Sequence, residues 1–231
     1  YTHSNSQCSK LFFNKIKTKK LLKKNKILVP NYLSIRAKEI TTKKLKFIKD
    51  KFSKFVIKPS ESGSSFGVHI KKNDLEFKLL LKNIKKIKKE LINHTTLLIE
   101  EYVNGTELTV SVTKFNKKIK PLAVTEIKPK TTFFDYKAKY SKGFSKHILP
   151  ANLKIKKYNQ CMGLAKKVHK IFNCNSISRS DFIYDPKSKK IYFLEVNTQP
   201  GLTQVSLTPE QAKYKKISFN KLILGILENI N

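Results

Sequence analysis

The chain is poor in the residues on which disulfide scaffolds, zinc centres and membrane spans depend. Its three cysteines, Cys8, Cys161 and Cys174, are odd in number and lack metal-site spacing, which favours a reducing cytoplasm over a disulfide framework. Its five histidines are scattered and form no zinc pattern. There is no apolar run of about eighteen residues and no visible signal peptide, so we expect no membrane association. The 231 residues suffice for one large domain or two small ones.

Arginine is almost absent from a chain that is otherwise strongly basic. The net charge is +33, yet Arg36 and Arg179 are the only arginines among 49 basic residues. A charge of this size suggests nucleic-acid binding, but arginine is the usual reader of phosphates and base edges. Lysine runs such as residues 19–26 and 82–90 are most simply exposed helix faces. We therefore expect no nucleic-acid partner; the opposite hypothesis predicts one lysine stripe and a steeply salt-dependent affinity for DNA.

Glycine and acidic residues are also scarce, which makes their positions informative. The chain has seven glycines and sixteen acids. Four of the glycines, Gly63, Gly67, Gly105 and Gly201, lie in short loops beside strand-like segments. Rare residue types concentrated in a few loops indicate a local requirement there.

The hydrophobic pattern predicts an α+β fold with mainly antiparallel strands. Residues 1–14 show no clear period, and residues 128–152 form a long aperiodic segment typical of a functional lid or a disordered loop. A boundary is expected near residue 107. The predicted helices cover residues 15–24, 36–50, 73–90, 157–172 and 218–230. The predicted strands cover residues 54–60, 68–72, 96–103, 107–115, 119–127, 177–185 and 190–197.

Two loops suggest nucleotide binding. In "KPSESGSSFG" (58–67) small residues let backbone N–H groups approach an anion, and Lys58 adds a charge. The loop lacks the order of a P-loop, and an ordinary Ser/Gly hairpin explains it equally well. In "LLIEEYVNGTEL" (97–108) a buried strand ends in acids that could meet a nucleobase edge and ribose hydroxyls. Taken alone, this second segment is more simply a solvated strand end.

The acids of "RSD" (179–181) and "EVN" (195–197) form the strongest constellation. On adjacent strands of a hairpin, Asp181, Glu195 and Asn197 can converge from one face. Oxygen-only ligands suit a hard cation such as Mg²⁺. Arg179 shares that face and could stabilise developing negative charge. The alternative is a surface ion pair of little energetic consequence, which three oxygen ligands in an acid-poor chain make less favoured.

The long segment contains "FFDYKAKY" (133–140), in which aromatic residues alternate with lysines. Such a segment could close over a phosphorylated substrate. A disordered loop is the simpler alternative, and His147 nearby is a lone histidine of no evident role.

Together these segments, in this order, resemble the ATP-grasp ligases and, among them, the D-alanine–D-alanine ligase family. The resemblance extends over essentially the whole chain and rests on residues 58–67, 99–107, 133–140, 179–181 and 194–203, followed by Ser206 and Leu207. It implies an ATP-grasp fold in which two α+β units enclose the nucleotide. The implied units are a remnant of an N-terminal substrate domain (1–14), a central subdomain (15–107) and a C-terminal domain (108–231).

The resemblance implies a role for each matching residue. Lys15, Lys58, Ser65 and Lys139 would meet the ATP phosphates, Glu101 and Val103 the adenine through their backbone, and Glu107 the ribose. Asp181, Glu195 and Asn197 would hold two Mg²⁺ ions, with Mn²⁺ as an alternative. Arg179 and the Gly201 N–H would stabilise the oxyanion. Ser64 and Tyr140 would form the lid network over the first D-alanine, and Ser206 and Leu207 would hold the carboxylate of the second.

The implied activity is ATP-dependent synthesis of D-alanyl-D-alanine for peptidoglycan, through an acyl phosphate, by a cytoplasmic homodimer. Departures from the family pattern are Phe134, where an aromatic hydroxyl is common, and Ser62, where an acid is common. Most of the N-terminal substrate domain is expected to be missing, so this chain alone could bind ATP and ligate poorly. The alternatives are a ligase that uses D-lactate or D-serine as second substrate, which His147 keeps open, and an inactive truncated remnant.

Overall fold

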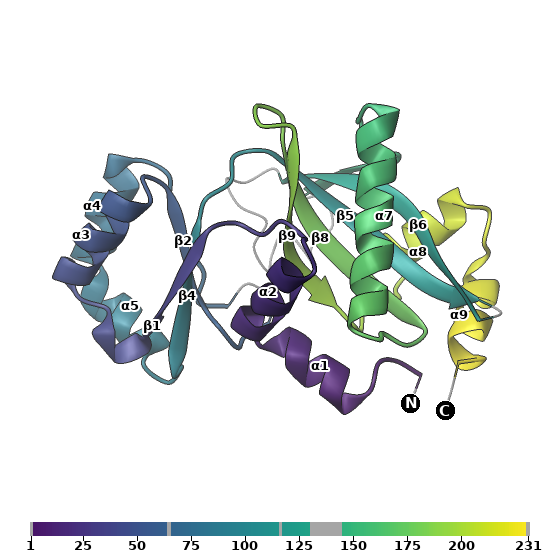
Figure 1. Ribbon diagram of the computed structural model, residues 1–231, viewed down its shortest axis with the longest axis horizontal. Helices are drawn as coiled ribbons and strands as arrows, with labels where there is room; N and C mark the ends of the chain where they lie inside the picture. The colour runs from purple at the N-terminus through teal and green to yellow at the C-terminus, as the bar shows by residue number, and fades with distance from the viewer. Residues whose placement is uncertain (1, 64–65, 116, 130–144, 230–231) are drawn as a thin grey trace.

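The computed structural model describes residues 2–63, 66–115, 117–129 and 145–229, and its chain forms two β-sheets that lie side by side, each with its own helices (Figure 1). The two cores are separate clusters of buried apolar side chains. The α+β class and the antiparallel pairing predicted from the sequence are confirmed.

The first sheet has four strands, in the order β1-β4-β2-β3, all paired antiparallel. One face is covered by the helices α3, α4 and α5 (Figure 1). In β4, Leu97 and Ile99 point into this core, so Leu98 and Glu100 point to the opposite face because strand side chains alternate. The bounds of these elements are β1 Tyr32–Arg36, a 3₁₀ turn Ala37–Glu39, α3 Thr42–Lys51, β2 Phe55–Pro59, β3 His69–Lys71, α4 Asp74–Lys82, α5 Ile84–Leu91 and β4 Thr96–Glu101.

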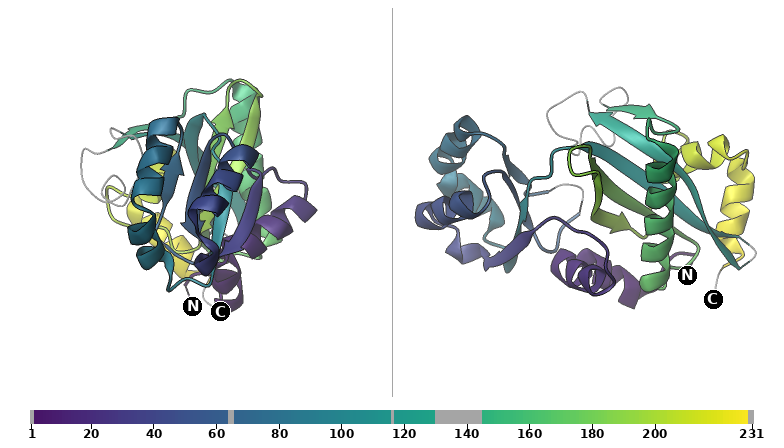
Figure 2. Two further views of the ribbon diagram at one scale, coloured as in Figure 1. Left: turned by 90° about the vertical axis from the view of Figure 1, so that its left-hand side faces the viewer. Right: turned by 45° about the horizontal axis from the view of Figure 1, so that its top comes forward.

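The second sheet has five strands, in the order β7-β6-β5-β8-β9, also antiparallel. The long helix α7 crosses one face, and α8 and α9 lie beyond the other (Figures 1 and 2). The pairing of β5 with β6 is interrupted between Val110 and Val112. The bounds are β5 Thr106–Phe115, β6 Lys118–Pro129, β7 Ser145–Ile148, α7 Ile155–Ile171, β8 Ile177–Asp185, β9 Lys190–Asn197, α8 Leu207–Tyr214 and α9 Phe219–Leu227.

The first two helices, α1 (Ser6–Phe13) and α2 (Lys15–Lys24), pack with the second sheet although they precede the first in sequence. Phe12 stacks on Phe172 at the end of α7, with ring centroids 4.1 Å apart. Leu22 of α2 is fully buried in the same cluster. The chain then enters the first sheet and returns between Glu101 and Thr106. The helix predicted over residues 15–24 thus forms, but its apolar face belongs to the core of the five-stranded sheet.

Three local differences from the sequence prediction have simple causes. The helix expected over residues 73–90 is two helices, because the Asn83 side chain donates to the Leu79 carbonyl at 3.0 Å and ends α4. The helix expected from residue 36 begins at Thr42, where the Thr41 hydroxyl caps it by accepting from the Lys44 N–H. The pattern does not predict α1 or α8, because helices of eight residues span too few turns to show a period.

None of the helices in the described part of the chain is both long enough and apolar enough to cross a membrane.

Candidate nucleotide and metal site

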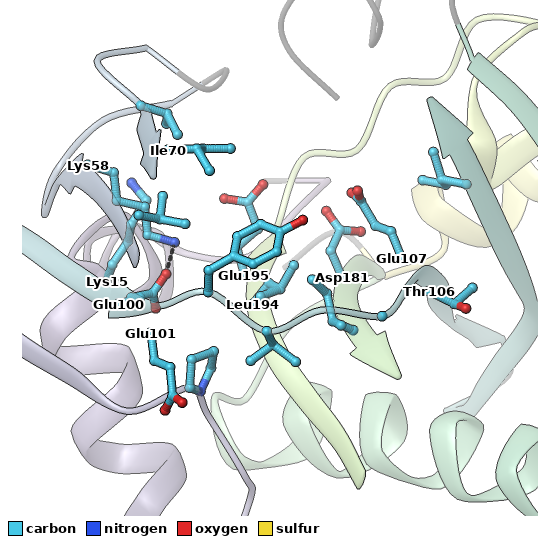
Figure 3. Close-up of a pocket in the computed structure, with 18 of the residues that line it drawn as sticks. Lys15, Lys58, Ile70, Glu100, Glu101, Thr106, Glu107, Asp181, Leu194 and Glu195 are labelled. Atoms are coloured by element: carbon cyan, nitrogen blue, oxygen red, sulfur yellow. Dashed lines mark ion pairs between the residues drawn. The ribbon is translucent and has the colours of Figure 1, made fainter. Parts of the chain in front are cut away.

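A cavity of about 500 Å³ lies between the two sheets. Figure 3 shows Lys15 and Lys58 together near Glu100 at one end, and Asp181 and Glu107 toward the other, with Glu195 between them. Seven residues predicted from the sequence as site residues line it: Lys15, Lys58, Glu101, Val103, Glu107, Asp181 and Glu195. The cavity therefore gathers residues from both halves of the chain that are far apart in sequence.

The start of α2 is fastened to the small-residue loop that follows β2. The Lys15 N–H donates to the Ser60 carbonyl at 2.9 Å, and the Lys15 ammonium donates to the Ser62 carbonyl at 2.6 Å. The carbonyl and the hydroxyl of Ser62 both accept from the Lys15 ammonium. Ser62 is the position at which the family resemblance predicts an acid. Gly67 closes the loop with φ of +65°, in the left-handed region that glycine tolerates best.

Glu100 lies between two lysines in a buried ion-pair cluster that the sequence analysis did not identify. One carboxylate oxygen pairs with Lys19 of α2 and the other with Lys58 of β2. The exposed fractions of the Lys19, Glu100 and Lys58 side chains are 1%, 3% and 12%. Glu100 and Lys58 line the cavity, and Lys19 lies behind them. The sequence did carry one signal, because strand alternation places Glu100 on the face opposite the core-facing Ile99.

Burial and pairing oppose each other in this cluster. Burial lowers the pKa of Lys19 below its usual range, while the charge of Glu100 acts to raise it. Burial alone would raise the pKa of Glu100, but the charges of Lys19 and Lys58 hold it below its ordinary value. Glu100 is therefore a carboxylate at neutral pH.

The segment that joins the two sheets forms one edge of the cavity. The Glu101 N–H donates to the Asn31 carbonyl at 2.8 Å, and its carboxylate accepts from the Asn31 amide at 2.8 Å. Asn31 thus engages both the backbone N–H and the side chain of Glu101. A Cβ on Gly105 would lie 2.2 Å from the Tyr184 carbonyl, so only glycine permits this close passage of the segment against β8.

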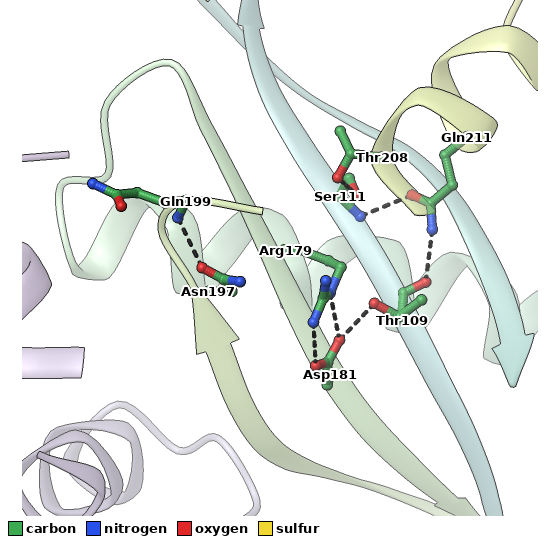
Figure 4. Close-up of polar contacts among 8 residues, drawn as sticks. All are labelled: Thr109, Ser111, Arg179, Asp181, Asn197, Gln199, Thr208 and Gln211. Atoms are coloured by element: carbon green, nitrogen blue, oxygen red, sulfur yellow. Dashed lines mark hydrogen bonds and ion pairs between the residues drawn. The ribbon is translucent and has the colours of Figure 1, made fainter. Parts of the chain in front are cut away.

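The predicted acid cluster forms on the β8–β9 hairpin. Asp181 pairs in register with Glu195, and Arg179 with Asn197. Arg179 holds Asp181 through two contacts, Nε to Oδ1 at 3.1 Å and Nη2 to Oδ2 at 3.0 Å, and the Thr109 hydroxyl donates to Oδ1 at 2.6 Å (Figure 4). Asp181 is therefore fixed from two sides.

The donor chemistry of this cluster fits a hard divalent cation. Asp181 and Glu195 supply carboxylates, and the Asn197 amide oxygen, which accepts from the Gln199 N–H at 2.8 Å, keeps a second lone pair. Within the described residues, no three histidine, cysteine, aspartate or glutamate side chains are grouped as a metal site. A cation here would therefore depend on the amide as well as on the two carboxylates.

The residues predicted to hold the second substrate lie at the start of α8. Ser206 is the N-cap residue, and its hydroxyl accepts from the Thr203 N–H at 3.2 Å. A Cβ on Gly201 would lie 2.8 Å from the Ser206 Oγ, so the loop packs tightly around this hydroxyl. Leu207, the first residue of the helix, is buried against Ile127. Gly201, Ser206 and Leu207 thus form one compact turn.

A buried amide that sequence reasoning missed anchors α8 to the second sheet. Gln211 is fully buried and spans the interruption between β5 and β6 (Figure 4). Its Oε1 accepts from the Ser111 N–H at 2.8 Å, and its Nε2 donates to the Thr109 carbonyl at 3.1 Å and to the Thr125 hydroxyl at 3.0 Å. The same Thr109 holds Asp181 through its hydroxyl. Helix α8 is thereby tied to β5, the strand whose Thr109 contacts Asp181 of the acid cluster.

His147 of β7 also contacts α8, with its Nδ1 2.9 Å from Glu210 Oε2. Ser64, Ser65, Lys139 and Tyr140, together with Phe134, lie outside the described residues.

The comparisons with known proteins agree on one family. A family model described as "D-ala D-ala ligase C-terminus" matches residues 21–228. The D-alanine–D-alanine ligase of Pelagibacter ubique is 40% identical over 234 residues, which cover 99% of this chain and 71% of that protein. The chain thus spans about seven tenths of this relative.

Solved structures show the same fold. The Bacillus anthracis D-alanine–D-alanine ligase complexed with ATP aligns with a TM-score of 0.75 at 26% identity, covering 99% of this chain and 70% of that one. The VanG D-Ala:D-Ser ligase of Enterococcus faecalis aligns with a TM-score of 0.79 at 27% identity, covering 98% and 64%. The predicted ATP-grasp architecture is confirmed. The chain belongs to the D-alanine–D-alanine ligase family.

Proposed function

We propose that the chain carries out the ATP-dependent ligation of two D-alanine molecules to D-alanyl-D-alanine, for peptidoglycan synthesis. The observation that carries the proposal is the cavity between the sheets, which has lysine ammoniums at one end and paired carboxylates toward the other. This arrangement matches the requirements of phosphoryl transfer, which needs positioning and neutralisation of charge more than covalent chemistry. The relatives' shared name supports the choice of D-alanine.

The nucleotide would lie along this cavity. The Val103 backbone and the Glu101 carbonyl would meet the adenine, Glu107 the ribose, and Lys15 and Lys58 the phosphates. The placement is supported by the fact that Lys15, Lys58, Glu101, Val103 and Glu107 all line this one cavity. Ser65 and Lys139 would add phosphate contacts, and Ser64 and Tyr140 would cover the first D-alanine.

Asp181, Glu195 and Asn197 would hold two Mg²⁺ ions beside the phosphates, with Mn²⁺ as a substitute, since Glu195 lies between the lysines and Asp181 (Figure 3). Bound there, the metal would neutralise phosphate charge during transfer. The fixed position of Asp181, held by Arg179 and Thr109, supports its role as a ligand, because metal carboxylates are usually oriented by such hydrogen bonds.

The reaction would proceed in two displacements. A carboxylate oxygen of the first D-alanine attacks the γ-phosphorus, the bond to the bridging oxygen breaks, and ADP leaves. The amine of the second D-alanine attacks the acyl carbon, loses a proton, and inorganic phosphate leaves. Arg179 and the Gly201 N–H would stabilise the oxyanion of the tetrahedral intermediate that forms in the second displacement, before phosphate leaves. The turn at Ser206 and Leu207 would hold the carboxylate of the second D-alanine, where the start of α8 favours an anion.

We further propose that the protein acts in the cytoplasm as a homodimer, as the resemblance implies. Gel filtration with light scattering would measure the oligomeric state directly; a monomer at micromolar concentration would contradict the dimer alone.

Nucleotide binding is the first test. Calorimetry should detect ATP binding in the presence of Mg²⁺, and phosphate release should depend on D-alanine, with D-alanyl-D-alanine as the product. Glu195→Gln should abolish phosphate release, whereas the matched change Glu228→Gln, at an exposed residue just after α9, should leave it unchanged. Absence of ATP binding by the folded chain would refute the proposal, and full turnover by Glu195→Gln would remove Glu195 from the metal site.

A further inference from the structure

The buried cluster around Glu100 contains one more cation than its carboxylate can neutralise. Lys19 and Lys58 both pair with Glu100, which leaves a formal charge of plus one on the three residues. A Lys58–Glu100 pair by itself would satisfy the carboxylate. Burying a further ammonium is costly, by several kcal/mol in typical proteins, so its presence calls for a physical reason.

The geometry assigns different positions to the two lysines. Lys58 is partly exposed and lines the cavity, whereas Lys19 is almost completely buried and lies on the far side of Glu100. Lys19 follows Lys15 by one helical turn, so both project from the same face of α2. The charge of Glu195 also acts on Lys19, which places Lys19 within electrostatic reach of the predicted metal end of the cavity.

We propose that Lys19 is a positioning residue for the nucleotide phosphates, which it never touches. By taking up one oxygen of Glu100, it prevents that carboxylate from cancelling the charge of Lys58, so that the end of the cavity around Lys15 and Lys58 keeps a net positive charge. The inference rests on the proposed function, because it requires nucleotide in this cavity. Lys19 should affect the binding of the phosphate chain, and the affinity for the nucleoside part should not depend on it.

This assignment differs from a purely structural role. A structural Lys19 would only fasten α2 to β4, and its loss would weaken adenosine and ATP alike. A charge-setting Lys19 affects ATP alone, because adenosine carries no phosphate. The ratio of the adenosine dissociation constant to the ATP dissociation constant therefore separates the two roles.

The experiment measures both constants in the whole chain with Mg²⁺, by competition against a fluorescent ATP analogue at fixed ionic strength. Lys19→Met should lower the ratio by about tenfold, the scale expected for one charge several ångströms away in a partly shielded site. Lys20→Met removes the same formal charge from the exposed neighbouring residue and should leave the ratio unchanged. Lys19→Arg, which retains the charge, should also preserve it.

A double variant tests whether the net charge of the cluster, and not the loss of the Lys19 side chain itself, sets the ratio. Lys19→Met combined with Glu100→Gln restores the net charge of plus one and should restore the ratio, even where the loss of Glu100 weakens both ligands. If Lys19→Met alone does not fold, the same change is measured on the Glu100→Gln background, where it should again lower the ratio about tenfold.

An unchanged ratio in Lys19→Met, or a ratio that the double variant does not restore, would overturn the inference. A wild-type chain that binds neither ligand would instead refute the proposed function.

Discussion

Replacing Gln211 by Met should destabilise the protein strongly while preserving the volume of the side chain. The amide of Gln211 satisfies the Ser111 N–H, the Thr109 carbonyl and the Thr125 hydroxyl at the interruption of the β5–β6 pairing. All four residues are fully buried, so water cannot replace the lost partner. A buried donor or acceptor left without a partner costs about 1–3 kcal/mol. The Thr125 hydroxyl can rotate, so we expect a loss of about 2–4 kcal/mol in the free energy of unfolding.

Urea unfolding measures this quantity, with the change taken from the midpoint at an unchanged slope. Gln160→Met is the matched control, because Gln160 is exposed on α7 and its amide oxygen accepts only from the Lys157 ammonium within the described residues. It should change the free energy of unfolding by less than about 0.5 kcal/mol. A loss below about 1 kcal/mol in Gln211→Met would show that α8 is held by its apolar contacts and that the amide is dispensable.

Two further substitutions test the environment of single groups. Thr109→Val removes the hydroxyl that holds Asp181 and should weaken Mn²⁺ binding by about tenfold, whereas Thr109→Ser should not weaken it. Electron paramagnetic resonance with ATP present measures the Mn²⁺ affinity. Equal affinities in the two variants would exclude Thr109 as a support of the metal site. Burial lowers the pKa of His169 to about 4, so the unfolded chain binds the extra proton between about pH 6.5 and 4 and stability falls as the pH drops through that range. His169→Gln should flatten this part of the stability curve and leave pH 7 to 8 unaffected; an unchanged slope would show that His169 is not the titrating group.

Most strands were predictable because their signal is local. The alternation in residues 107–115 and 119–127 predicts strands, and both segments form strands where expected. The turn that joins β8 to β9 is also set locally, because the Asp185 carboxylate accepts from the Lys187 N–H and the Ser188 hydroxyl. The short helices α1 and α8 left no comparable trace.

The acid cluster was predictable in part. Asp181 and Glu195 lie on two strands joined by a short turn, which brings them close together. The uninterrupted register, in which Phe182 pairs with Phe193, would place Asp181 opposite Leu194, and a register shift between Asp181 and Phe182 pairs it with Glu195 instead. The cluster around Glu100 was not, because Lys19, Lys58 and Glu100 come from a helix and two non-consecutive strands. In a chain with so many lysines, no pattern distinguishes a buried Lys19 from its exposed neighbour Lys20.

The sequence by itself determined the segments that identify the family, the strands that carry the site residues and the common side of Glu195 and Asn197 on their strand. The register shift between Asp181 and Phe182, which places Asp181 opposite Glu195, was decided by the tertiary structure. Only the tertiary structure decided that α2 packs on the second sheet while its Lys19 reaches Glu100 of the first. It also decided that the Gln211 side chain forms hydrogen bonds with β5 where the pairing of β5 with β6 is interrupted. The physical reason is that periodicity fixes the direction of a side chain relative to its own element, whereas the partner it meets depends on how separate elements bury their apolar faces together.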